Sequence, residues 1–122
     1  MPRGERVEGL PRRHRFATRG SFGPVLRDGR KIRGRKAVLH VAFAPDGVSR
    51  LGVGLTRKLV PLAVHRNRIK RRIREAFRRH RAKRLGVECV VMLRERVDAA
   101  SIGAVVDEVS SLLDRVVPAT SP

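Results

Sequence analysis

Residues 64–84 are the segment that most constrains how this chain can fold. They carry eleven Lys or Arg side chains and a single acidic one, Glu75. When the segment is plotted as a helix, at about 100° per residue, its apolar residues fall within one sector: Ile69, Ile73, Ala76 and Phe77. An amphipathic helix that packs on a sheet needs such a sector. The spacing therefore predicts one helix over residues 64–84, which ends near Leu85 and Gly86.

A second sector of the same helix gathers polar and basic side chains: Arg66, Asn67, Lys70, Arg71, Arg74, Arg78 and Arg81. Arginine meets phosphate with a planar fork of donors, whereas lysine acts as a point charge. This density of cations predicts a surface that binds a nucleic acid backbone. A solvated basic face is the plainer interpretation. A helix lying on an anionic membrane is disfavoured, because the apolar sector has no Trp and one Phe. Glu75 is expected to pair with Arg71, Arg78 or Arg79.

Charge is distributed unevenly along the 122 residues. The net charge is +18, whereas a magnitude of about 2 to 8 suffices to keep a small domain soluble. Residues 1–84 hold 26 basic and 5 acidic side chains, and residues 85–122 hold 3 and 6. We expect a basic N-terminal arm over 1–17, one α/β RNA-binding domain over 18–117 and a C-terminal tail over 118–122.

The sequence offers little for a metal site or for catalysis by the protein itself. Cys89 is the only cysteine, which excludes an intramolecular disulfide and a cysteine-rich zinc site. Its apolar neighbours predict a buried, reduced thiol. The histidines show no metal-ligand spacing, and no clustered carboxylates suggest a nuclease site. No segment has the length and hydropathy of a signal peptide or a membrane span, so we expect a cytoplasmic protein.

Alternating residues predict strands in the middle of the chain. Apolar residues follow a period of two along 36–44 and again along 50–56, as is typical of strands. Residues 88–93 predict a further, mostly apolar strand. A short helix is expected from Thr18 or Ser21 to about Arg27, ended by Asp28 and Gly29. A last helix is expected over residues 99–117, where apolar residues recur at helical spacing.

These elements predict the α/β fold class, as an α+β sandwich. We expect a small mixed four-stranded sheet in the order α-β-β-β-α-β-α, with helices packed on one face and an open cleft on the opposite face. The residues expected to face the helices are Leu39, Val41, Phe43, Leu51, Val53 and Leu55. Those expected on the open face are Val38, His40, Gly52 and Gly54. Two glycines on one strand face would leave it nearly bare, so this face is a candidate groove.

Three motifs carry a resemblance to a known family. Residues 63–71 read AVHRNRIKR and residues 74–78 read REAFR, a run that resembles the RNR signature helix of the bacterial ribonuclease P protein subunit. Residues 50–58, RLGVGLTRK, are similar to the family's strand that leads into a basic turn. The chain also resembles the family's N-terminal segment, at Leu10-Pro11, His14-Arg15-Phe16, Ser21-Phe22 and Gly29. The motifs follow one another in the same order and with the same gaps as in the family. The resemblance runs from about Leu10 to Leu113.

The resemblance implies a subunit that binds a large catalytic RNA and, in an open cleft, the single-stranded 5′ leader of precursor tRNA. The RNA performs the removal of the leader with Mg²⁺, which is bound mainly by the RNA. The implied RNA-binding residues are Arg57, Lys58, Arg66, Asn67, Arg68, Lys70, Arg71 and Arg74. The implied leader-cleft residues are Phe22, Leu26, Val38 and His40. No catalytic or metal-binding residue, no membrane contact and no obligate protein partner is expected of this chain.

The sequence departs from the family pattern at two aromatic positions. Leu26 stands where many members carry a second aromatic residue on the first helix, and His40 stands where the sheet often supplies Tyr. Stacking on an unpaired base contributes about 1 to 3 kcal/mol by alanine substitution, so we expect the leader contact here to rely more on charge. Phe22 could instead be a core residue. The alternative functions are a structural rRNA-binding protein and a nuclease that acts alone.

Overall fold

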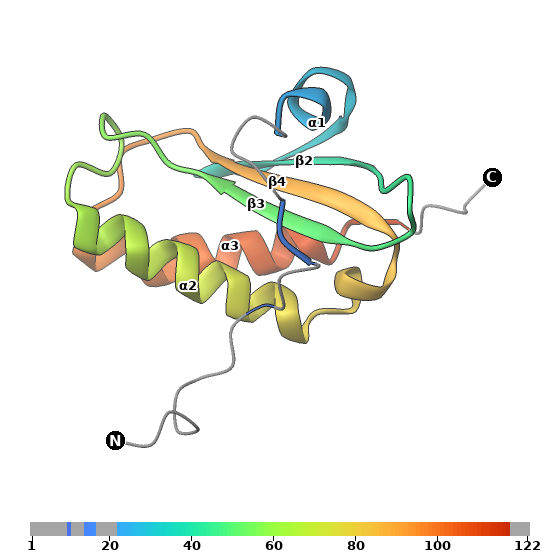
Figure 1. The fold of residues 1–122 in the computed structure, drawn as a ribbon. Coiled ribbons are helices and arrows are strands. Elements are labelled where there is room, and N and C mark those ends of the chain that lie inside the picture. The colour runs from blue at the N-terminus through green and yellow to red at the C-terminus, as the bar shows by residue number, and fades with distance from the viewer. Residues whose placement is uncertain (1–9, 11–13, 17–21, 118–122) are drawn as a thin grey trace.

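Four strands form a single mixed sheet, and two long helices cover one of its faces (Figure 1). The computed structural model describes residues 10, 14–16 and 22–117. The strands are β1 (Arg30–Arg33), β2 (Ala37–Phe43), β3 (Arg50–Gly54) and β4 (Val87–Leu93). The helices are α1 (Gly23–Asp28), α2 (Ala63–Arg79) and α3 (Ile102–Leu113), with 3₁₀ turns at Arg81–Arg84 and Ala99–Ser101. None of these helices is long and apolar enough to cross a membrane. The predicted α+β class and element order are confirmed.

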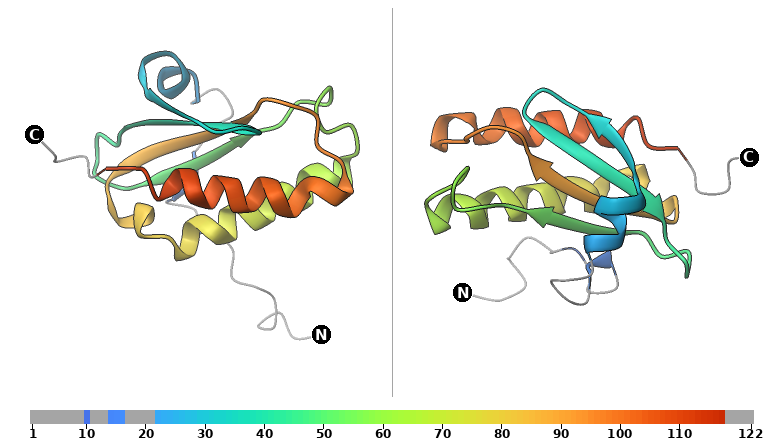
Figure 2. Two further views of the ribbon diagram at one scale, coloured as in Figure 1. Left: turned by 180° about the vertical axis from the view of Figure 1, so that it is seen from behind. Right: turned by 90° about the horizontal axis from the view of Figure 1, so that it is seen from above.

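The order of the strands in the sheet is β1-β2-β4-β3. β2 is antiparallel to β1 and β4, whereas β3 is parallel to β4. A parallel pair needs a crossover connection, and α2 provides most of it. β1 and β3 are therefore the two edges of the sheet, and β3 is the edge that α2 follows (Figure 2).

The core lies between the sheet and the helices α2 and α3. Ile69, Ile73 and Phe77 of α2 are fully buried, as predicted. The buried residues of α3 are Ile102, Val105, Val106, Val109, Leu112 and Leu113. The prediction for Phe43 is wrong, because its side chain is 67% exposed. Phe43 is the last residue of β2, and at that end of the strand neither helix covers it.

The basic helix is shorter than predicted. α2 ends at Arg79 because His80 is extended, with φ −88° and ψ 149°, and residues 81–84 form a separate 3₁₀ turn. The His80 side chain stabilises this break: Nδ1 accepts a hydrogen bond from the Ala82 N–H at 2.9 Å. Its Nε2 lies 2.6 Å from Asp114 Oδ1. Because Nδ1 acts as acceptor, Nε2 carries the proton that is donated to the carboxylate.

Ser49 joins this 3₁₀ turn to the start of β4. Its Oγ donates to the Ala82 carbonyl at 3.1 Å and accepts from the N–H groups of Gly86 and Val87 at 2.8 and 3.0 Å. Its carbonyl accepts a hydrogen bond from His14 Nδ1 at 2.8 Å. One buried serine therefore satisfies backbone groups on two segments and fixes a third.

The described N-terminal residues pack against β3. Leu10 is fully buried, and Arg15 forms a parallel bridge with Leu51. Part of the segment expected as an arm is thus attached to the domain. The expected helix caps Thr18 and Ser21 lie outside the described residues.

α1 lies on the face of the sheet opposite α2 and α3 (Figures 1 and 2). It ends at Asp28, with Gly29 as the C-cap, as predicted. Val25 is buried, and the helix contacts β2 and β4. One end of this face is therefore covered.

The two glycines of β3 do not leave this face bare, contrary to the prediction. A methyl group at Gly52 would collide with the Phe22 ring, and one at Gly54 would collide with the Met92 sulfur. The absence of Cβ atoms makes room for these two side chains. The glycines thus allow these two side chains to pack closely on this face of the sheet.

Burial controls the chemistry of Cys89. The side chain is fully buried within β4, as predicted. Burial raises the pKa of its thiol to about 12, so the thiol stays protonated and unreactive near neutral pH.

Gly52→Ala should destabilise the fold by about 1 to 3 kcal/mol, because the added methyl group overpacks against Phe22. The matched control is Gly103→Ala, since a Cβ there meets nothing within 4 Å. Gly103 lies in α3, so this control should be neutral or stabilising by up to about 1 kcal/mol. Urea unfolding of both variants measures the difference. Equal stability of the two variants would contradict the packing of Phe22 on Gly52.

Candidate nucleic-acid interface

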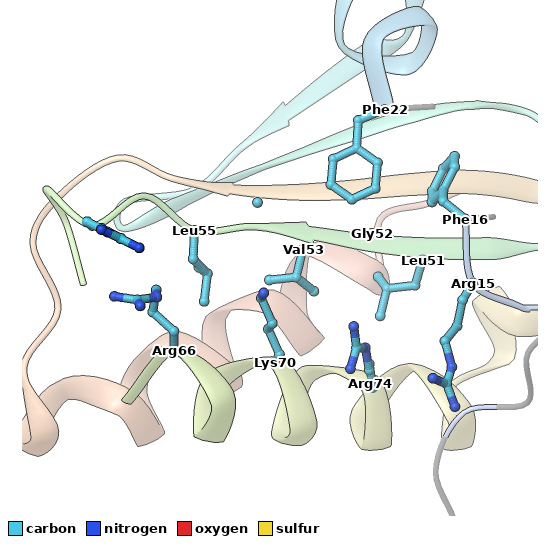
Figure 3. A pocket seen from close by; sticks show the side chains of 12 residues that line it. Arg15, Phe16, Phe22, Leu51, Gly52, Val53, Leu55, Arg66, Lys70 and Arg74 are labelled. Atoms are coloured by element: carbon cyan, nitrogen blue, oxygen red, sulfur yellow. The ribbon is translucent and has the colours of Figure 1, made fainter. Parts of the chain in front are cut away.

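A groove of about 720 Å³ runs along the outer edge of β3. Residues 51–55 form its floor, and the basic sector of α2 forms one wall. Figure 3 shows Arg66, Lys70 and Arg74 rising from α2 toward β3, with Phe16 and Phe22 on the other side of the strand. The groove therefore combines a cationic wall with two aromatic rings.

Five basic side chains line the groove: Arg15, Arg57, Arg66, Lys70 and Arg74. No acidic side chain is among the described lining residues. Partial burial, followed by the charge of Arg15, lowers the pKa of Arg74 below its usual value. Both causes disfavour the charged form, and the attraction of an anion in the groove would offset them.

Two of the arginines are held in place by backbone carbonyls. Arg66 Nη1 donates to the carbonyls of Val60 and Pro61 at 2.8 and 2.9 Å. Arg15 Nε donates to the Leu10 carbonyl at 2.8 Å. A guanidinium has five N–H donors, so both groups keep donors for phosphate oxygens. The cost of ordering these side chains is already met in the unbound protein.

The aromatic side of the groove consists of Phe16 and Phe22. Their ring centroids are 5.1 Å apart and their planes are at 72°, an edge-to-face arrangement. Both side chains are only partly buried. Phe22 therefore does both things that the sequence left open: it packs on Gly52 and it presents surface to the groove.

Five of the residues predicted for RNA or leader binding line this groove: Phe22, Arg57, Arg66, Lys70 and Arg74. Four others are exposed beside it, on α2 or in the loop that precedes it: Lys58, Asn67, Arg68 and Arg71. Leu26 and Val38 are half-buried and do not line the groove. The basic sector thus divides between the groove and the outer surface of α2.

His40 differs most from its expected environment. It was expected on the open face, but it is only 9% exposed. Burial, together with the charges of Lys31 and Arg33, lowers the pKa of its imidazole. Its Nδ1 has no hydrogen-bond partner in the described part of the chain. Alternation gave the correct face of β2, but it could not show that α1 covers this position.

Glu75 pairs with Arg78 and Arg79, which do not line the groove. Both pairs were among those predicted. Its carboxylate accepts from Arg78 Nε and Nη2 at 3.0 and 2.7 Å and lies 2.8 Å from Arg79 Nε. The hydrogen bonds from Arg78 are the main cause that lowers the pKa of Glu75. The acidic side chain of α2 therefore pairs with arginines at the end of the helix beyond Arg74.

Arg15 and Phe16 were not predicted as site residues. They lie in a segment without periodicity, and only their part in the family resemblance drew attention to them. The bridge from Arg15 to Leu51 and the hydrogen bond from His14 to Ser49 bring them to the groove. Contacts between residues this distant in sequence have no local signal.

Lys70→Gln should weaken the binding of single-stranded RNA to the full chain and reduce the salt slope by about 0.7, the contribution of one phosphate contact. Among the described residues no acidic side chain pairs with Lys70, so the substitution breaks no ion pair within the protein. The control is Arg96→Gln, which removes the same charge from an exposed position outside the groove. Fluorescence anisotropy over a range of salt concentrations measures both effects. Equal losses for the two variants would show that only overall charge matters.

Comparisons with known proteins agree with the motifs. Residues 10–117 match the family model described as Ribonuclease P. The ribonuclease P protein component of Nitrosomonas eutropha is 37% identical over 113 residues, covering 91% of this chain and 93% of that protein. The structure of the ribonuclease P protein from Thermotoga maritima aligns with a TM-score of 0.67 and 29% identity, covering 84% of this chain and 97% of that one. For the Staphylococcus aureus protein the TM-score is 0.65 and the identity 26%, over 84% and 91%. The chain therefore belongs to the ribonuclease P protein family, an RNA-binding family of tRNA processing.

Proposed function

We propose that this chain is the protein subunit of a ribonuclease P ribonucleoprotein and holds the 5′ leader of precursor tRNA in the groove beside β3. The observation that carries the proposal is the pairing of a cationic wall with two partly exposed aromatic rings in one groove. Single-stranded nucleic acids are bound by this combination, in which cations follow the backbone and rings stack on bases.

The two parts of the basic sector suggest two RNA contacts. Arg66, Lys70 and Arg74 face the groove and would hold the leader. Asn67, Arg68 and Arg71 are exposed on the outer surface of α2 and are available to the catalytic RNA. One helix would thereby place the leader against the RNA partner, which is how a small protein can improve substrate binding without taking part in bond cleavage.

Catalysis is assigned to the RNA partner with Mg²⁺. Magnesium binds oxygen ligands, usually carboxylates and phosphates, whereas the groove offers cations and apolar groups. Among the described residues, no three His, Cys, Asp or Glu side chains form a metal-binding group. These residues do not fit Mg²⁺, so we place the ion on the RNA. The proposed location is the cytoplasm, and no further protein is needed for the contacts described.

Reconstitution tests the division of roles. The protein alone should not cleave precursor tRNA, whereas adding it to the RNA subunit at low Mg²⁺ should increase cleavage, because the groove contributes affinity for the leader. The measurement is release of the 5′ leader under single-turnover conditions. Cleavage by the protein alone, persisting through repeated purification, would refute the assignment. Equal affinity of the complex for leader-bearing and leaderless tRNA would favour a structural rRNA-binding role.

Phe22→Ala should weaken binding of leader-bearing precursor tRNA by about 1 to 3 kcal/mol, because a stacking surface is lost. Binding of mature tRNA should change little. Since Phe22 also packs on Gly52, Phe22→Leu is a second variant that keeps apolar volume and removes the ring. Affinities of the reconstituted complex and melting temperatures are measured together. If both variants weaken the two tRNA forms equally, Phe22 acts through the fold and not through stacking.

A further inference from the structure

Lys70 is the one lysine among the described residues that line the groove, where the other cations are arginines: Arg15, Arg57, Arg66 and Arg74. The rest of the chain has four further lysines: Lys31, Lys36, Lys58 and Lys83. An arginine would contact a phosphate at least as well as a lysine does. What a lysine adds is an amine that can act as a nucleophile, which a guanidinium cannot.

Two arginines flank Lys70 along α2. Arg66 and Arg74 lie about one turn before and one turn after it, each displaced by about 6 Å along the helix axis. Figure 3 shows the three side chains rising from the helix toward β3. Two backbone carbonyls hold Arg66 in place, and no acidic side chain is among the described lining residues. The amine therefore stands between two groups that bind phosphate.

A small anion that carries an electrophilic carbon fits this arrangement, and an acyl phosphate is such an anion. Its phosphate would be bound by the arginine forks. Its carbonyl carbon is joined to the phosphate through a single oxygen, so a phosphate held by Arg66 or Arg74 brings that carbon to the side chain of Lys70. The floor of the groove offers Val53 and Leu55 to the alkyl part of the acyl group. Holding the two reactants together in this way accelerates their reaction.

The geometry points to Lys70 as a site that acyl phosphates acylate without an enzyme. The unprotonated Nζ attacks the carbonyl carbon, and the bond from that carbon to the bridging oxygen breaks. Phosphate leaves with the electron pair, and the nitrogen gives up a proton to water. The product is an uncharged amide. Because every lysine must lose a proton before it attacks, a comparison between lysines of the same chain isolates the effect of their surroundings.

Acylation would weaken RNA binding, because it removes one of the five cations that line the groove. Bound RNA would in turn cover Lys70 and prevent the reaction. Modification and RNA binding therefore exclude each other, so the free protein is modified and the ribonucleoprotein is protected. This consequence rests on the proposed function, whereas the acylation itself requires only the groove.

Exposure alone predicts a different order of reactivity. Lys58 is exposed and does not line the groove, whereas Lys70 is half-buried. An uncharged acylating reagent should therefore modify Lys58 faster than Lys70. Lys36 is a second internal control, because its Nζ lies 3.0 Å from Glu95 Oε1. The carboxylate holds the ammonium form and repels an anion, so Lys36 should react slowly with either kind of reagent.

The test treats the full chain, free of RNA, with acetyl phosphate or with the uncharged ester N-hydroxysuccinimidyl acetate. Peptide mass spectrometry measures the rate at each lysine. With acetyl phosphate Lys70 should react several-fold faster than Lys58, and with the uncharged ester the order should reverse. Excess inorganic phosphate should remove the preference for Lys70, and so should about 1 M salt, where the Debye length is about 3 Å.

Substitutions test the part of the arginines. Arg66→Gln and Arg74→Gln should each slow the reaction of Lys70 with acetyl phosphate several-fold and leave its reaction with the uncharged ester unchanged. The matched control is Arg96→Gln, which removes the same charge from an exposed position outside the groove and should keep the wild-type rate. Melting temperatures check that the variants fold.

The outcomes separate this inference from the proposed function. If Lys58 reacts faster than Lys70 with both reagents, reactivity follows exposure, and the inference is overturned while the proposed function stands. If Arg96→Gln slows Lys70 as much as Arg66→Gln does, the effect is overall charge and the inference is likewise overturned. If saturating single-stranded RNA fails to protect Lys70, the mutual exclusion is wrong and the groove is not the RNA site, whereas the acylation of Lys70 by acetyl phosphate stands.

Discussion

The parallel pairing of β3 with β4 determines how the rest of the molecule is arranged. Parallel neighbours cannot be joined by a tight turn, so the chain must return to the starting end of the sheet before β4 begins. α2 makes most of this return, and its apolar sector holds it on the sheet through Ile69, Ile73 and Phe77. Once that sector is buried, Arg66, Lys70 and Arg74 lie toward the edge of β3. The groove is therefore a consequence of how the crossover packs.

The distribution of acids supports this arrangement by leaving the groove without counter-charges. Glu75 is engaged by Arg78 and Arg79. The Glu108 carboxylate of α3 accepts hydrogen bonds from the backbone N–H groups of Lys36 and Ala37 at 2.7 and 2.9 Å, which fixes the turn between β1 and β2. The acids thus stabilise the scaffold at positions outside the groove. The mutual repulsion of the groove cations is a cost in the free protein that a polyanion can remove.

The buried side of a single helix or strand could be predicted from the sequence, whereas contacts between elements were harder to predict. Helical spacing gave the buried side of α2, because one face of a helix repeats locally. The end of α2 at His80 was missed, since the partner that stabilises the break, Asp114, is distant in sequence. β1 was expected in the element order, but residues 30–33 contain one apolar side chain and no alternation located it. Arg15 and Phe16 required contacts with β3 that no local pattern encodes.

Alternation also could not predict which residues of the sheet face are buried. A period of two correctly assigned His40 and the glycines to the face opposite the long helices. It could not tell that Phe22 and Met92 would occupy the space above the glycines. Exposure depends on what covers a face, and here the cover comes from α1 and β4. Residues at the ends of strands, such as Phe43, are subject to the same uncertainty because covering helices have finite length.

The hydrogen bonds of Ser49 have a mechanical consequence for the groove. Through its carbonyl Ser49 holds His14, whose neighbours Arg15 and Phe16 belong to one side of the groove, and through its hydroxyl it holds the turn that follows α2, the other side. The two walls are therefore braced against a common point that no RNA would touch. The positions of both sides of the groove therefore depend on one buried residue, and the width of the groove depends on the fold as well as on the cations that line it.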